Sequence, residues 1–151
     1  MKAISVSLLL LLITVAPCLA GGGDIAGSWL NQDKDARIEI SQCGQKYCGK
    51  IVWLREPNYP VGSKEGTPGT PKVDHNNPDV NLRKTPVLGM EIMHDFEPEK
   101  DGFWTNGKIY DPKSGKTYSG KITMVSPNEL RLRGYVGISL IGRTEVWTRA
   151  N

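Results

Sequence analysis

Short runs in which apolar and polar residues alternate constrain this chain more than any other feature of its sequence. In residues 36–41, Ile38 and Ile40 share one face and Arg37 and Glu39 share the other, as in a half-buried β-strand. Most such runs are joined by short turns, and none shows the period of a long amphipathic helix. Eight strand-like runs can be traced, at residues 24–31, 36–41, 50–54, 87–96, 103–110, 117–125, 130–133 and 144–149. The pattern predicts an all-β antiparallel meander, either closed into a barrel or folded as a sandwich.

One segment interrupts this pattern. Residues 55–86 contain six prolines and three glycines, which exclude a central strand and a long helix. We expect one long Pro-rich loop here, with at most a short helical turn near residues 79–83. An eight-stranded barrel encloses an interior that side chains fill or that holds one small ligand. The loop would then cross an open end of the barrel.

The N-terminal residues have the composition of an export signal. A positive start precedes an apolar stretch at residues 4–15, which is shorter than the roughly 20 residues that span a bilayer. Small residues precede a cleavage position after Ala20, so we predict that residues 1–20 are a cleaved signal peptide. The alternative is a lipoprotein signal acylated at Cys18, which the preceding proline fits poorly. Residues 21–151 would then form one domain of periplasmic or secreted location, with no transmembrane segment.

Composition narrows the expected partners. The whole chain has a formal net charge of +3, and loss of Lys2 with the leader lowers this to +2. Such a small positive excess gives no reason to expect nucleic acid as a partner. His75 and His94 are the only histidines, so a multi-histidine metal site is excluded, and we expect no metal and no cofactor. We expect a monomer.

Cys43 and Cys48 are the cysteines of the expected mature chain. In an oxidising compartment they allow one pairing, and a bridge would close a short loop between two strand-like runs. We therefore predict a structural disulfide. A zinc site would need two further ligands, and a redox pair is typical of C-x-x-C at a helix start, which is absent.

Residues near the two ends of the expected mature chain suggest how the sheet closes. Gly27 and Trp29 lie in the first strand, and Trp147 and Arg149 lie in the last. These strands meet in a closed barrel, where an arginine over a tryptophan ring contributes about 0.5–2 kcal/mol. The paired G-x-W and W-x-R resemble the end-closing pair of the lipocalin-like (calycin) barrels. The alternative is that both tryptophans are ordinary core aromatics.

A wider pattern extends over nearly the whole expected mature chain. Its residues are Gly27-Ser-Trp29, Ile38-Glu-Ile40, Cys43, Cys48-Gly-Lys-Ile51, Asp74, Asn77-Pro78, Arg83, Pro86, Gly89, Trp104, Gly107-Lys-Ile-Tyr-Asp-Pro112, Gly115-Lys-Thr-Tyr118, Arg133-Gly134 and Trp147-Thr-Arg149. In this pattern the chain resembles the bacterial exported family labelled domain of unknown function 2147. The resemblance implies a small exported, eight-stranded up-and-down barrel of lipocalin-like type, and it carries no established activity.

Several polar residues are candidates for contact with a ligand. Arg131, Arg133 and Tyr135 share one face of a late strand, and the Arg-x-Tyr spacing of Arg133 and Tyr135 resembles the pair that grips a carboxylate inside fatty-acid-binding barrels. A shift of one residue in strand register would place them on a solvated outer face instead. His94 is expected in line with Ile92, where it either lines a cavity or is a satisfied core residue.

The densest polar cluster lies within the long loop. Asp74, Asn77 and Arg83 offer oxygens, an amide and a guanidinium to a ligand, or they cap turns and tie the loop to the barrel. A calcium site is a third interpretation, although the spacing of an EF-hand is absent.

No motif of a known catalytic class is present. The sequence contains no G-x-S-x-G, no H-E-x-x-H and no phosphate-binding loop, and no spacing marks two carboxylates as a glycosidase pair. We therefore interpret the chain as a non-enzymatic barrel that binds a small lipid-like molecule, amphiphilic or apolar. The cavity would be lined by the inward faces of residues 88–96, 104–110, 118–124 and 130–136. The alternatives are a packed barrel that acts through its surface as an envelope interaction or stress module, and a hydrolase.

Overall fold

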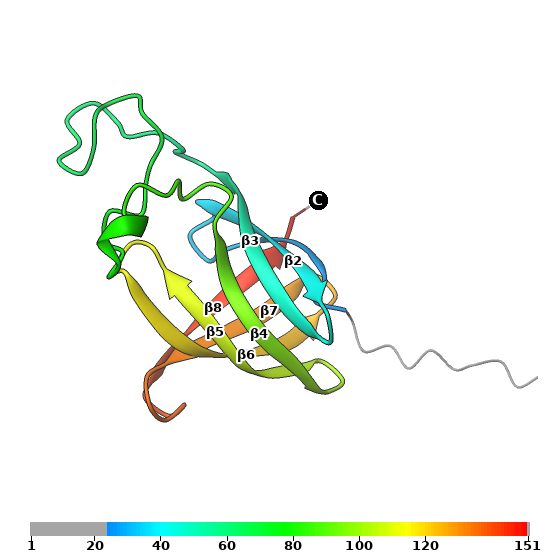
Figure 1. Cartoon of the computed structure of the whole chain (residues 1–151). Helices are drawn as coiled ribbons and strands as arrows, with labels where there is room; N and C mark the ends of the chain where they lie inside the picture. Colours follow the sequence, from blue (N-terminus) through cyan, green and yellow to red (C-terminus); the bar gives the residue numbers. More distant parts are fainter. Residues whose placement is uncertain (1–23, 151) are drawn as a thin grey trace, which may run out of the picture.

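The computed structural model describes residues 24–150, so the expected signal peptide at residues 1–20 lies outside the described residues. Eight antiparallel strands follow one another round a closed barrel, and the last strand pairs with the first (Figure 1). The predicted all-β, eight-stranded up-and-down barrel is thereby confirmed. The strands are β1 (Gly27–Leu30), β2 (Ala36–Cys43), β3 (Lys46–Leu54), β4 (Glu91–Lys100), β5 (Phe103–Asp111), β6 (Lys116–Ser126), β7 (Glu129–Tyr135) and β8 (Gly142–Arg149).

The connection between β3 and β4 is the long excursion expected from its prolines. It stands off one end of the barrel and contains a single short 3₁₀ helix, η1 (Val80–Leu82) (Figure 1). Because β4 begins at Glu91 rather than at residue 87, the connection runs over residues 55–90. Isolated bridges, such as the one between Val73 and Pro86, give it internal order.

The two ends of the barrel carry different connections. Since neighbouring strands are antiparallel, one end, here called the open end, carries residues 31–35, 55–90, 112–115 and 136–141. The other, here called the closed end, carries the short turns at residues 44–45, 101–102 and 127–128. Among residues 24–150, no helix is both long and apolar enough to cross a membrane.

Aromatic side chains fill the interior near the closed end. Phe96 is fully buried, and the rings of Tyr47 and Trp104 meet edge to face with their centroids 6.1 Å apart. Gly107 and Gly120 lie against the Phe96 ring, and a Cβ at either position would overlap it. Glycine is therefore required on β5 and β6 to admit a phenyl ring across the interior.

The first and last strands are locked together at the closed end. Trp29 is fully buried and donates from its indole Nε1 to the carbonyl of Ile25 at 2.8 Å. The Arg149 guanidinium lies 4.2 Å from the centroid of the Trp29 ring. It also donates to three backbone carbonyls, those of Asp24, Ala26 and Pro127. Gly27 has a φ of 121°, and a Cβ there would lie 2.7 Å from Arg149 Nη1, so both its backbone and its neighbour favour glycine.

Strand β4 departs from the strict alternation expected for residues 87–96. The register against β3 shifts at Gly49, and Ile92 and Met93 are consequently both buried. Asp95 then adopts a φ of 60°, after which Phe96 is buried again. The expectation that Ile92, His94 and Phe96 share one face is therefore wrong. The irregular pairing of β4 interrupts the alternation of inward and outward side chains on which that expectation depends.

Cys43 and Cys48 form a disulfide across the β2–β3 hairpin, with their Cα atoms 5.9 Å apart. The predicted pairing is confirmed. The bridge joins the last residue of β2 to β3 at the closed end of the barrel.

Candidate functional site

A cavity of about 1020 Å³ opens between the four connections of the open end. Its deeper walls come from the inward faces of the strands and are apolar apart from Glu145, which lies opposite Leu132. They are formed by Ile38, Ile51, Leu54, Ile92, Ile109, Tyr118, Leu132 and Trp147. Gly134 also lines the cavity, and a Cβ added there would meet Tyr118 Cβ at 3.6 Å, an ordinary contact distance. The interior thus remains unfilled by side chains in this half of the barrel.

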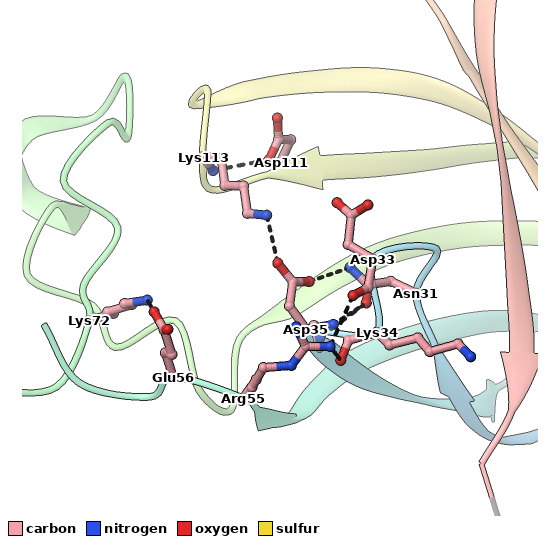
Figure 2. Close-up of polar contacts among 10 residues, drawn as sticks. Asn31, Asp33, Lys34, Asp35, Arg55, Glu56, Lys72, Asp111 and Lys113 are labelled. Atoms are coloured by element: carbon pink, nitrogen blue, oxygen red, sulfur yellow. Dashed lines mark hydrogen bonds and ion pairs between the residues drawn. The ribbon is translucent and has the colours of Figure 1, made fainter. Parts of the chain in front are cut away.

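Charged side chains surround the mouth of the cavity. Asp35 accepts hydrogen bonds from Asn31 Nδ2 at 2.6 Å and from Lys113 Nζ at 3.0 Å (Figure 2). Burial alone would raise the pKa of Asp35, but the bonds from Asn31 and Lys113 and the positive charge of Lys113 outweigh it, so this pKa is lowered. The same bond to Asp35 raises the pKa of Lys113. An ion pair therefore joins the β1–β2 turn to the β5–β6 turn across the rim.

The long loop is attached to the same rim. Arg55 Nη2 donates to the carbonyl of Lys34 at 2.6 Å and to that of Asp33 at 3.1 Å (Figure 2). Lys72 lies 3.5 Å from Glu56 within the loop (Figure 2). The Arg55 bonds fix the start of the loop against the β1–β2 turn, and the Lys72–Glu56 pair joins two parts of the loop to each other.

Arg143, on the inward face of β8, lies farther from its acidic partner than Lys113 and Lys72 lie from theirs. Arg143 and Glu145 are opposite Gly134 and Leu132 of β7, so they share the cavity face with Trp147. Glu145 accepts from Trp147 Nε1 at 3.1 Å, whereas Arg143 Nε is 3.9 Å from the Glu145 carboxylate. The Arg143 side chain is 73% exposed, which leaves its donors available at the mouth. Arg143, Glu145 and Trp147 are spaced by two residues, so they point to the same face of the strand. An apolar Trp147 therefore predicts from the sequence that Arg143 faces inward, a signal that we did not use above.

The register of β6 and β7 decides where Arg131 and Arg133 point. Leu132 of β7 is opposite Ile122 of β6, and both side chains are buried. The residues that alternate with them along each strand therefore project outward. Arg131 and Arg133 accordingly lie outside the cavity. Tyr135 shares their parity but comes at the end of β7, where it lines the mouth.

The cluster Asp74, Asn77 and Arg83 pins the long loop to the barrel. Asp74 is fully buried and accepts from Asn77 Nδ2 at 2.6 Å, and Tyr110 Oη lies 2.8 Å from both of its carboxylate oxygens. Arg83 Nε donates to the carbonyl of Asn77 at 2.8 Å. Burial raises the pKa of Tyr110 to about 12, with the hydrogen bond and negative charge of Asp74 adding to the effect. Of these residues, Tyr110 borders the cavity.

His94 lies apart from the cavity. Its Nδ1 is 2.7 Å from Glu91 Oε1, and both side chains are nearly half exposed. Within residues 24–150, no three His, Cys, Asp or Glu side chains are grouped so that they could hold a metal ion.

Comparison with known proteins agrees with this architecture. Residues 27–149 match the family described as an uncharacterized protein conserved in bacteria (DUF2147). Among solved structures, protein HP1028 from Helicobacter pylori, described as belonging to the lipocalin family, is similar in fold with a TM-score of 0.69 and 21% identity. That match covers 85% of this chain and 84% of HP1028. No curated protein matches the sequence. With the family match spanning β1 to β8, the chain belongs to the bacterial DUF2147 family and adopts a lipocalin-like barrel.

Proposed function

We propose that this barrel binds a small amphiphilic molecule, such as a fatty acid, outside the cytoplasm. The observation that carries the proposal is the division of the cavity into apolar walls and a charged mouth. An apolar chain is stabilised by leaving water for the walls around Ile51, Ile109 and Leu132. A polar head group would remain at the rim, where it keeps its hydrogen bonds and contact with water. The Cys43–Cys48 disulfide agrees with an oxidising compartment.

We assign the head-group contact to Arg143 rather than to Arg131 or Arg133. Arg143 is on the cavity face and, among the three rim cations that form ion pairs, has the longest ion-pair distance, 3.9 Å against 3.0 Å for Lys113 and 3.5 Å for Lys72. A carboxylate placed there would form a charge-assisted hydrogen bond without breaking the pairs that hold the rim together.

The test is displacement of a fluorescent fatty acid by hexadecanoate, together with native mass spectrometry of the protein purified from its host. Gly134→Phe adds a ring into the cavity at a position where a Cβ has room, and it should weaken binding at least tenfold. Thr123→Phe adds the same ring to the outward face of β6, opposite Arg131, and should leave binding unchanged. Saturable binding that is unaffected by Gly134→Phe, or the absence of any binding, would refute the proposal.

A second pair of variants tests the head-group contact. Arg143→Gln should weaken binding of hexadecanoate and leave that of hexadecanol unchanged, because the alcohol carries no charge. Arg131→Gln removes an outward-facing guanidinium as the matched control. Equal losses for the acid and the alcohol would show that Arg143 does not contact the head group.

A further inference from the structure

The connection between β7 and β8 exposes an unusual number of aliphatic side chains. Val136 is 71% exposed, Ile138 60%, Leu140 86% and Ile141 74%. Isolated exposed aliphatic residues are common on soluble proteins, but a group of this kind marks a surface that contacts another apolar phase.

We call this connection (residues 136–141) the apolar tip. One arginine of β7 holds its backbone in place. Arg133 Nε donates to the carbonyl of Ser139 at 2.7 Å, and its Nη2 donates to that of Leu140 at 3.1 Å. A further bond joins Ile141 N to the carbonyl of Ile138 at 3.2 Å. Since these bonds satisfy backbone acceptors in the exposed conformation, the fold itself presents the aliphatic side chains to the outside.

Positive charge lies beside the apolar tip on the outward face of the barrel. Lys121 of β6 is opposite Arg133 of β7, and Arg131 lies two residues further along β7. None of these three cations makes an ion pair with another of residues 24–150. Strand β6 contains no Asp or Glu, and Glu129, the one acidic residue of β7, lies at the far end of that strand from the apolar tip.

We propose that the apolar tip and this basic face dock on an anionic phospholipid bilayer. The aliphatic side chains would enter the boundary between head groups and acyl chains, and the cations would meet lipid phosphates. A second protein surface is a poorer match, because the aliphatic residues are carried on a short connection at the end of the barrel and unpaired cations lie next to them. Unpaired Lys and Arg complement a negatively charged lipid surface without burial of a lone charge.

Docking in this orientation has a consequence for the cavity. Val136 and Ile141 of the apolar tip also line the mouth, so the mouth would face the leaflet. An amphiphile could then pass between bilayer and barrel without crossing water. This last step rests on the proposed function, whereas docking itself does not.

The experiment is cosedimentation with vesicles of phosphatidylglycerol and phosphatidylethanolamine, and with vesicles of phosphatidylcholine alone. The protein is expressed with its leader in an exporting bacterium and its N-terminus is read by intact mass, so that all variants share the same start. We expect binding to the anionic vesicles that falls with added NaCl. Leu140→Ser with Ile141→Ser should weaken it at least tenfold, while Val125→Ser, an exposed aliphatic near the closed end, should not change it.

The charge requirement is tested separately. Lys121→Gln should weaken binding by about fivefold, the usual effect of one basic residue near an anionic surface. Lys50→Gln, on β3 opposite Glu39 and Glu91, loses the same charge elsewhere on the barrel and should have little effect. Equal effects at the two lysines would overturn the proposed orientation.

Other outcomes separate the two proposals. Vesicle binding without hexadecanoate binding keeps the docking surface and refutes the cavity function, and the reverse result keeps the cavity function and refutes docking. If light scattering shows a dimer that Leu140→Ser dissociates, the apolar tip joins two copies of the chain and the docking proposal is wrong.

Discussion

The bond between Tyr110 and the buried Asp74 gives the sharpest prediction, because a single hydroxyl couples the long loop to β5. Tyr110→Phe removes the hydroxyl that lies 2.8 Å from both carboxylate oxygens and leaves Asn77 Nδ2 as the remaining side-chain donor to Asp74. One proton is shared by two oxygens, so a single charge-assisted bond is lost, with a typical value of about 1.5–3 kcal/mol. Tyr110 is partly exposed and water can replace some of that energy, which favours a loss of about 1.5–2 kcal/mol.

Urea unfolding measures the global effect, and amide hydrogen exchange shows whether the loop opens first. The amide of Asp74 donates to the carbonyl of Thr85 within the loop. If the loop detaches from β5 more often in the variant, exchange of this amide should accelerate about tenfold or more. Tyr118→Phe is the matched control, since the Tyr118 hydroxyl makes no hydrogen bond to another of residues 24–150. The same loss of stability in both variants would refute the reasoning.

The pH dependence provides a second readout of the same bond. Folding raises the pKa of Tyr110 from 10.0 to about 12, so the neutral phenol is favoured in the folded state. The stability that it contributes is therefore fully present below pH 10 and is lost as the pH rises through about 12. The difference in unfolding free energy between the wild type and Tyr110→Phe should narrow over this range, and a constant difference would contradict the assignment.

Four further variants test the closed end and the packing. Arg149→Ala, which removes three backbone hydrogen bonds and the stacking on tryptophan, should lower the free energy of unfolding by about 2–4 kcal/mol in urea titrations. Replacement of both Cys43 and Cys48 by serine should cost about 2 kcal/mol, because the bridge closes a loop of only six residues; an unchanged urea midpoint would argue against this entropic account. Gly107→Ala should cost about 1–3 kcal/mol through overlap with a buried phenyl ring, whereas Gly134→Ala, whose Cβ would make an ordinary contact with Tyr118, should leave stability unchanged or raise it by up to about 1 kcal/mol.

Much of the fold could be predicted from the sequence because the strands are short and their alternation is regular. Leu130 and Leu132 alternate with Arg131 and Arg133, and the structure buries the leucines. The prolines of residues 55–86 likewise left no alternative to a long connection. The exception was β4, where an irregular register and the positive φ of Asp95 change which side chains point inward. Nothing in the local sequence marks such a shift, since it depends on which partner strand lies opposite.

The candidate site was harder to predict, since it depends on which face each strand turns inward and on which residues lie opposite each other. Arg143 and Arg133 are both arginines on late strands, yet one is on the cavity face and the other supports the apolar tip from outside. Asp74 and Tyr110 are 36 residues apart, and their contact follows from the path of the long loop. Composition alone shows neither relation.

The glycines of the inward face show why one half of the barrel is packed and the other is not. The Phe96 ring occupies the space in front of Gly107. In front of Gly134, a Cβ would have Tyr118 Cβ as its nearest neighbour at 3.6 Å, and the cavity lies beyond it. A closed sheet cannot contract around that space without loss of strand hydrogen bonds, so a bound chain is the available source of new packing contacts. Hexadecanoate at a hundredfold excess over its dissociation constant should then raise the unfolding free energy by about 2.7 kcal/mol. Gly134→Phe should be more stable than the wild type without ligand and should gain little from its addition. Equal stabilisation of both proteins by hexadecanoate would place its binding site outside the cavity.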